Sequence, residues 1–101
     1  IAGSMRPEWE GVEIGGPEPG VMRDLACFDQ YSLTLAPAHL SSVQAATLPI
    51  AALTAWEILE QAGVATGHTV LLLGTGGVSL FALQFAKLRG ARTIILSSSI
   101  E

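Results

Sequence analysis

Residues 69–99 contain the pattern that most restricts what this chain can fold into. Thr69–Leu73 is a short run of mainly Val and Leu bounded by Gly67 and Gly74, which predicts a strand buried on both faces of a parallel sheet. Gly76–Leu88 follows with the apolar spacing of an amphipathic helix. The expected buried stripe of this helix consists of Val78, Phe81, Phe85 and Leu88.

The second half of this pattern predicts a further strand. Lys87 and Arg89 lie in the last turn of the predicted helix, where they complement the helix dipole, and Gly90 is expected to end it. Thr93–Leu96 is then a second short apolar run. The order strand, glycine turn, helix, glycine and strand is that of one β-α-β unit. We therefore expect an α/β fold, with this unit as the first β-α-β unit of a Rossmann-type parallel sheet.

The turn at Gly74–Ser79 has the sequence Gly-Thr-Gly-Gly-Val-Ser. The dinucleotide fingerprint Gly-x-Gly-x-x-Gly/Ala uses its glycines for a tight turn, for close approach of the pyrophosphate, and for packing of helix on strand. Gly74 and Gly76 fill the first two places, and Ser79 fills the third with a small residue that is not glycine. The pyrophosphate would meet the free N–H groups at the start of the helix. A glycine turn in some other α/β protein is the alternative.

The residues after the second strand bear on the choice of cofactor. The fingerprint expects an acidic residue there to bind the ribose 2′-hydroxyl, and Ser97 occupies that place. A carboxylate would repel a 2′-phosphate, whereas a serine can donate a hydrogen bond to it. Ser97, Ser98 and Ser99 therefore favour NADP over NAD. The alternative is that the three serines form only a polar loop.

The first forty residues differ from the rest in composition and in the structure that they predict. Residues 6–20 hold three prolines and four glycines, which predicts a loop, and Phe28–Leu35 alternates as a strand does. Ser41 or Ser42 offers the N-cap of a helix over Val43–Gly63, with a kink or restart at Pro49. The apolar side of that helix is expected to contain Ile50, Leu53, Trp56 or Ala55, Ile58 and Leu59.

Composition excludes several classes of protein. Half of the residues are apolar and 14% are charged, which excludes a disordered chain, and the net charge of −4 argues against a nucleic-acid partner. Residues 61–86 have no charged side chain, but their five glycines and several polar residues argue against a membrane span. Cys27 is the only cysteine, which fits a reducing cytoplasm. We assign no catalytic residue: His68 is interpreted as a loop residue, His39 as structural or solvated, and Cys27 has no histidine partner nearby in sequence.

Three segments in order, Ala45–Pro49, Leu53–Trp56 and Thr69–Lys87, resemble the medium-chain dehydrogenase/reductase superfamily. The nearest branches are the zinc-type alcohol dehydrogenase-like and the quinone oxidoreductase-like proteins. The resemblance implies that residues 1–40 are the C-terminal remnant of a GroES-like catalytic domain. It implies that residues 41–101 are the first part of an NAD(P)-binding Rossmann domain.

The resemblance also implies an activity and a set of cofactor-binding residues. The activity is NAD(P)-dependent hydride transfer involving an alcohol, a carbonyl compound or an activated alkene. Thr54 matches a threonine near the nicotinamide, and Ser97 matches the position at which NAD-preferring members have aspartate. The implied cofactor-binding residues are Thr54, Gly74, Thr75, Gly76, Gly77, Val78, Ser97, Ser98 and Ser99.

Two departures from the family limit this interpretation. Zinc-dependent members have a cysteine ligand where this chain has Ile50, so we expect no catalytic zinc. Family members are also several times longer. We therefore weigh two hypotheses: the NADP-binding portion of a cytoplasmic, homo-oligomeric oxidoreductase that acts on a small-molecule substrate, and a non-catalytic module that binds a nucleotide or associates with itself.

Overall fold

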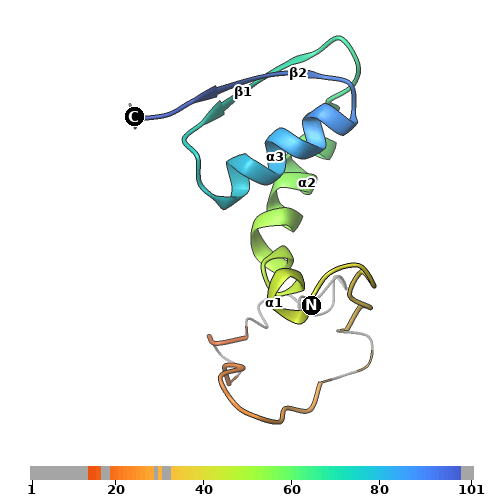
Figure 1. Cartoon of the computed structure of the whole chain (residues 1–101), viewed down its shortest axis with the longest axis vertical. Coiled ribbons are helices and arrows are strands. Elements are labelled where there is room, and N and C mark those ends of the chain that lie inside the picture. Colours follow the sequence, from red (N-terminus) through yellow and green to blue (C-terminus); the bar gives the residue numbers. More distant parts are fainter. Residues whose placement is uncertain (1–13, 17–18, 29, 31–32, 99–101) are drawn as a thin grey trace. The chain divides into compact units, whose positions relative to one another are not determined.

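The computed structural model describes residues 14–16, 19–28, 30 and 33–98 (Figure 1). The chain divides into two compact units, Ile1–Pro49 and Ile50–Glu101. The helices and strands in chain order are α1 (Ser42–Ala45), the π-helix η3 (Leu48–Ala52), α2 (Leu53–Gln61), β1 (Thr69–Leu73), α3 (Gly77–Leu88) and β2 (Arg92–Leu96).

The two strands form a parallel pair, which confirms the predicted β-α-β unit and the α/β class. Leu71 lies opposite Ile94, and Leu73 lies opposite Leu96. The pairing extends past Leu73, because the Gly74 N–H donates to the Leu96 carbonyl at 2.8 Å. Parallel strands need a crossover, and α3 supplies it. The predicted bounds of β1 match the structure, and those of α3 and β2 differ by one residue.

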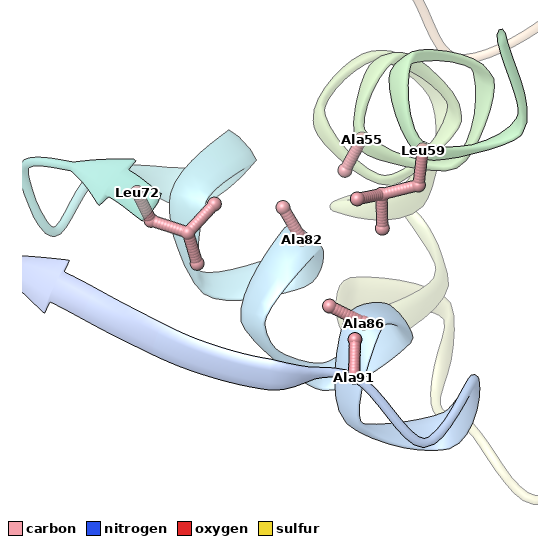
Figure 2. Packing of buried hydrophobic residues seen from close by; sticks show 6 residues of the cluster. All are labelled: Ala55, Leu59, Leu72, Ala82, Ala86 and Ala91. Atoms are coloured by element: carbon pink, nitrogen blue, oxygen red, sulfur yellow. The ribbon is translucent and has the colours of Figure 1, made fainter. Parts of the chain in front are cut away.

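The core of the second unit lies where α3 meets the strands and α2. α3 contacts both strands, and α2 packs against α3 (Figure 1). Figure 2 shows six buried side chains of this core, of which four are alanines. Ala55 and Ala86 are completely buried. Because an alanine side chain is a single methyl group, the two helices approach each other closely. The cluster consists of Ala55, Leu59, Leu72, Ala82, Ala86 and Ala91.

The expected apolar stripes were only partly confirmed: Ala55, Leu59, Phe81 and Phe85 pack in or against the core, whereas the other members are exposed. In α3, Leu88 is 81% exposed and Phe81 and Phe85 are half-buried, whereas Ala82 and Ala86 are buried. In the helical run before β1, Ala55 and Leu59 are buried, while Ile50, Leu53, Trp56 and Ile58 are exposed. The sequence pattern favoured large apolar side chains. At a close helix contact, small side chains occupy the interface and large ones are displaced to its margin.

The expectation that β1 is buried on both faces was wrong. Leu71 is 58% exposed and Leu73 is 72% exposed, and Ile94 and Leu96 of β2 are exposed beside them. In the part of the chain that the structure describes, α3 covers the strands and α2 covers α3. A single helix layer buries only one face of a sheet, so the alternate residues of β1 stay exposed.

Phe28–Leu35 does not form the predicted strand in the residues that are described, namely 28, 30 and 33–35. Residues 29, 31 and 32 lie outside the described part. A strand is stabilised by hydrogen bonds to a neighbouring strand. The described residues before Thr69 contain no other strand to pair with this segment.

The predicted helix over Val43–Gly63 forms as three consecutive pieces rather than one. The Ser41 hydroxyl accepts from the Gln44 N–H at 3.3 Å, and the Gln44 side chain accepts from the Ser41 N–H at 2.9 Å. This capping box confirms the N-cap prediction. Pro49 lies in η3, which confirms the restart, since proline has no N–H to donate to the helix. Gly63, at φ +61°, follows the end of α2 as predicted.

The helical run Ser42–Gln61 is long and apolar enough to cross a membrane, by length and composition alone. One such run is weak support for a membrane span, because a helix of a folded domain can have the same composition. Here Ala55 and Leu59 of the run pack into the core against α3. The run is also interrupted by the π-helix around Pro49.

Trp56 joins α2 to the last turn of α3. Its ring meets Phe85 edge to face at 5.4 Å, and the Arg89 guanidinium lies 4.6 Å from its centroid. Arg89 also donates to the Glu60 carboxylate at 2.7 Å. Trp56 therefore packs against the last turn of α3 although its ring is partly exposed. Because Glu60 is largely exposed, the stacking on Trp56 fixes Arg89 more than the ion pair does.

Gly90 ends α3 under two constraints that can be separated by mutation. Its φ is +75°, and an added Cβ would lie 2.6 Å from the Thr66 Oγ1, which donates to the Arg89 carbonyl. Gly67 has φ +89° but open space around an added Cβ. We expect Gly67→Ala to lower the free energy of unfolding by about 1–2 kcal/mol. Gly90→Ala should lower it by a further 1 kcal/mol or more, roughly.

Urea denaturation of both variants and the unchanged protein measures this difference. If Gly67→Ala and Gly90→Ala lower the free energy of unfolding by the same amount, the contact with Thr66 does not constrain Gly90.

Candidate functional site

Gly74 turns the chain out of the sheet. Its φ of +80° is a backbone conformation that residues with a side chain rarely adopt, and its N–H still pairs with the Leu96 carbonyl. No heavy atom lies within 4 Å of an added Cβ, so space is not the constraint. The first place of the fingerprint therefore needs glycine for its backbone angle.

Gly76 forms the N-cap of α3, and neither its backbone angles nor local packing requires glycine there. Its φ of −74° and ψ of 172° suit any residue, and an added Cβ would meet nothing within 4 Å. A Cβ added to Gly76 would project into open space beside the first turn of α3. The observed arrangement fits close approach of a ligand to the backbone, which is the role of the second fingerprint glycine.

The first turn of α3 presents backbone N–H groups next to this space. The first helical hydrogen bond runs from the Leu80 N–H to the Gly76 carbonyl at 3.0 Å. The N–H groups of Gly77, Val78 and Ser79 precede it, so the helix itself provides them with no acceptor. Together with the positive end of the helix dipole, such groups attract a phosphate.

Gly77 at the start of α3 lies near Ala51 of η3. An added Cβ at Gly77 would lie 3.4 Å from the Ala51 Cβ, which is the edge of ordinary van der Waals contact. Thr54 is exposed in the first turn of α2, three residues after Ala51.

Ser79 also contributes more than the small size that the fingerprint requires. Its hydroxyl donates to the Leu73 carbonyl at 3.1 Å and so links the first turn of α3 to the last residue of β1. The sequence contains a signal for this bond, because the third fingerprint place has a hydroxyl residue instead of glycine or alanine.

Ser97 lies at the same edge of the sheet as the glycine turn. The register pairs Leu73 with Leu96, so Gly74 and Ser97 both continue from the carboxyl ends of paired strands. Ser98 follows in an exposed bend, and Ser99 lies outside the described residues.

The charges around this edge suit an anion. Residues 69–98 contain no Asp or Glu, and their charged side chains are Lys87, Arg89 and Arg92. All three lie near the end of α3 and the start of β2, away from the turn in sequence. The attraction for a phosphate at the turn would therefore come from backbone N–H groups and the helix dipole rather than from a cationic side chain.

The side chains that the structure describes do not build a metal site. No three His, Cys, Asp or Glu residues among them gather closely enough to hold an ion. Ile50, which the family resemblance aligns with a zinc-ligating cysteine, has a hydrocarbon side chain and is 81% exposed.

No protein-family model matches the chain. A zinc-type alcohol dehydrogenase-like protein of Schizosaccharomyces pombe is 46% identical over 91 residues, covering 87% of this chain and 26% of the relative. The crystal structure of a Sinorhizobium meliloti protein assigned as an alcohol dehydrogenase matches with a TM-score of 0.81 and 44% identity, covering 85% of this chain and 26% of that one. The chain belongs to the medium-chain dehydrogenase/reductase superfamily.

Two further members of the superfamily widen the comparison. The 2-methylene-furan-3-one reductase of Solanum lycopersicum is 37% identical over 89 residues, covering 85% of this chain and 23% of the reductase. The quinone oxidoreductase of Thermus thermophilus, whose complex with NADPH has been solved, matches with a TM-score of 0.63 and 32% identity, covering 67% of this chain and 23% of that one. The chain spans about a quarter of the length of these relatives.

We expect substitutions at Gly74 and Gly76 to have different effects on the stability of the ligand-free protein. Gly74→Ala must place a side chain at φ +80°, which should lower the free energy of unfolding by about 1–2 kcal/mol. Gly76→Ala keeps an ordinary conformation in open space and should change it by less than about 0.5 kcal/mol. Urea denaturation of both variants measures the contrast. If Gly76→Ala lowers the free energy of unfolding as much as Gly74→Ala does, the view that glycine at position 76 is needed only for a ligand is contradicted.

Proposed function

We propose that this chain is the NADP(H)-binding portion of an oxidoreductase that resembles alcohol dehydrogenases and quinone oxidoreductases. The proposed reaction is hydride transfer between the nicotinamide and an alcohol, a carbonyl compound or an enone. The observation that supports it most strongly is Gly76, whose lack of a side chain serves neither the backbone nor the packing. A ligand that approaches the backbone there accounts for glycine at this position.

The cofactor pyrophosphate would be held at the first turn of α3. In this proposal the N–H groups of Gly77 and Val78 donate to the phosphate oxygens, and the helix dipole adds to the attraction. Gly74 and Thr75 shape the loop before the helix, and Thr75 is exposed on it. Superfamily membership supports these assignments, since the Thermus thermophilus relative was solved with NADPH.

Ser97, Ser98 and Ser99 would face the adenosine ribose. The position beside the glycine turn, at the carboxyl ends of both strands, supports this role for Ser97. Hydroxyl groups can donate to a 2′-phosphate, whereas the aspartate expected in NAD-preferring relatives would repel it. We therefore propose NADP(H) rather than NAD(H) as the cofactor.

The bound nicotinamide would supply the hydride or accept it. The residues of this chain would bind and orient the cofactor, and Thr54 is proposed to lie near its nicotinamide end. We assign no acid or base for proton transfer to this chain. We propose a zinc-independent reaction, because Ile50 replaces the cysteine ligand of zinc-dependent relatives and cannot bind the ion.

The wider setting of the activity follows from the family. We propose that residues 1–40 complete a GroES-like domain and that residues 41–101 begin a Rossmann domain. We further propose a cytoplasmic homo-oligomer that acts on a small-molecule substrate. Neither a nucleic acid nor a membrane is among its proposed partners.

A second candidate function is a non-catalytic module that binds a nucleotide or associates with itself. One observation favours self-association. Leu71, Leu73, Ile94 and Leu96 form an exposed apolar face on the paired strands. Self-association without binding of either nicotinamide nucleotide would favour this function over the oxidoreductase.

Titration with NADPH, followed by nicotinamide fluorescence, tests the role of Gly76. We expect the protein to bind NADPH and Gly76→Ala to bind it at least about tenfold more weakly, because the added methyl group occupies the phosphate space. Gly67→Ala is the matched control, since it adds the same methyl group in open space away from the turn. Equal affinity of the protein and Gly76→Ala for NADPH would contradict the proposed site.

Ser97→Asp tests the proposed cofactor preference. The new carboxylate should weaken NADPH binding about tenfold or more, because it would repel the 2′-phosphate. Binding of NADH, which has no 2′-phosphate, should stay equal or improve. Parallel fluorescence titrations with the two nucleotides measure the ratio of the affinity for NADPH to the affinity for NADH. If this ratio is the same in Ser97→Asp as in the unchanged protein, the 2′-position of the cofactor does not lie near Ser97.

A further inference from the structure

Ser79 makes a hydrogen bond that the dinucleotide fingerprint does not require. The fingerprint expects glycine or alanine at this place, and neither has a side-chain donor. In this chain the Ser79 hydroxyl donates to the Leu73 carbonyl at 3.1 Å. The bond spans the whole glycine turn, from the last residue of β1 to the third residue of α3.

One other contact holds the same turn from a different side. The Gly74 N–H donates to the Leu96 carbonyl at 2.8 Å, which fixes the start of the turn to β2. The Ser79 bond adds a second attachment, which ties the first turn of α3 directly to the end of β1.

This attachment acts on the groups that would meet a phosphate. The N–H groups of Gly77 and Val78 lie between the two ends of the Ser79 bond along the chain. If the first turn of α3 frays, their directions change and the helix loses its anion-binding end. A bond that keeps the turn formed before the ligand arrives reduces the cost of ordering it on binding.

We propose that Ser79 is a positioning residue for the pyrophosphate of the cofactor. Its hydroxyl holds the first turn of α3 against β1, so that the backbone N–H groups are oriented before binding. The affinity for ligands that contain a pyrophosphate then depends on this hydroxyl, although the hydroxyl itself does not touch the ligand. This inference rests on the proposed cofactor function.

Ser79→Ala and Thr66→Val form a matched pair for the test. Each variant removes one hydroxyl that donates to a main-chain carbonyl, Leu73 in the first case and Arg89 in the second. The two bonds lie at opposite ends of α3. A general loss of stability would therefore appear in both variants, whereas an effect on the phosphate turn would appear only in Ser79→Ala. Ser79→Thr restores a hydroxyl.

Three ligands separate positioning from general stability: NADPH, inorganic pyrophosphate and adenosine 2′-monophosphate, which contains no pyrophosphate. We expect Ser79→Ala to bind NADPH and pyrophosphate about three- to tenfold more weakly, the range for loss of one neutral hydrogen bond. Its affinity for adenosine 2′-monophosphate should stay unchanged. Ser79→Thr and Thr66→Val should bind all three ligands as the unchanged protein does. Calorimetric titration measures these affinities.

Amide hydrogen exchange in the ligand-free protein provides a second readout. Ser79→Ala should exchange the N–H groups of Gly77 and Val78 faster, and Thr66→Val should not. Unchanged affinities and unchanged exchange in Ser79→Ala would overturn the inference. Equal weakening for all three ligands would reduce Ser79 to a structural residue and overturn it as well. If the unchanged protein binds neither NADPH nor pyrophosphate, the proposed function itself fails, which is a distinct result.

Discussion

Close packing of α3 against α2 through small side chains determines where the glycine turn lies. Ala55 of α2 and Ala86 of α3 are completely buried in the same core cluster. A larger side chain at either position would push the elements around it apart. The helix would then move relative to the strands that it connects, and the first turn of α3 would move with it. The candidate site thus depends on packing outside the turn itself.

The residues of the turn differ in what the folded protein requires of them. Gly74 is needed for its backbone angle, and Ser79 makes a hydrogen bond to the Leu73 carbonyl. Gly76 meets no such requirement in the protein alone. The same six residues therefore combine positions that build the loop with one that leaves space for a ligand.

The sequence predicted the order of elements well, because glycines and prolines mark element ends through local backbone geometry. Pro49, Gly63, Gly74 and Gly90 all lie at the predicted breaks. It predicted the buried residues poorly, since burial depends on which face meets another element. Ala82 and Ala86 are buried in a cluster with residues of α2 and β1, neighbours that no local pattern contains. The same limit applied to the site, where the Ser79 bond and the Gly77 contact depend on three-dimensional neighbours.

Membership of the medium-chain dehydrogenase/reductase superfamily and the geometry of the turn lead to one central claim: the first backbone N–H groups of α3 bind the cofactor pyrophosphate. NMR of the backbone amides during addition of NADPH tests it most directly. The account predicts that the largest shifts fall on Gly76–Ser79, with smaller shifts at Ser97 and Ser98. Shifts that leave Gly76–Ser79 unchanged while other residues respond would contradict the claim.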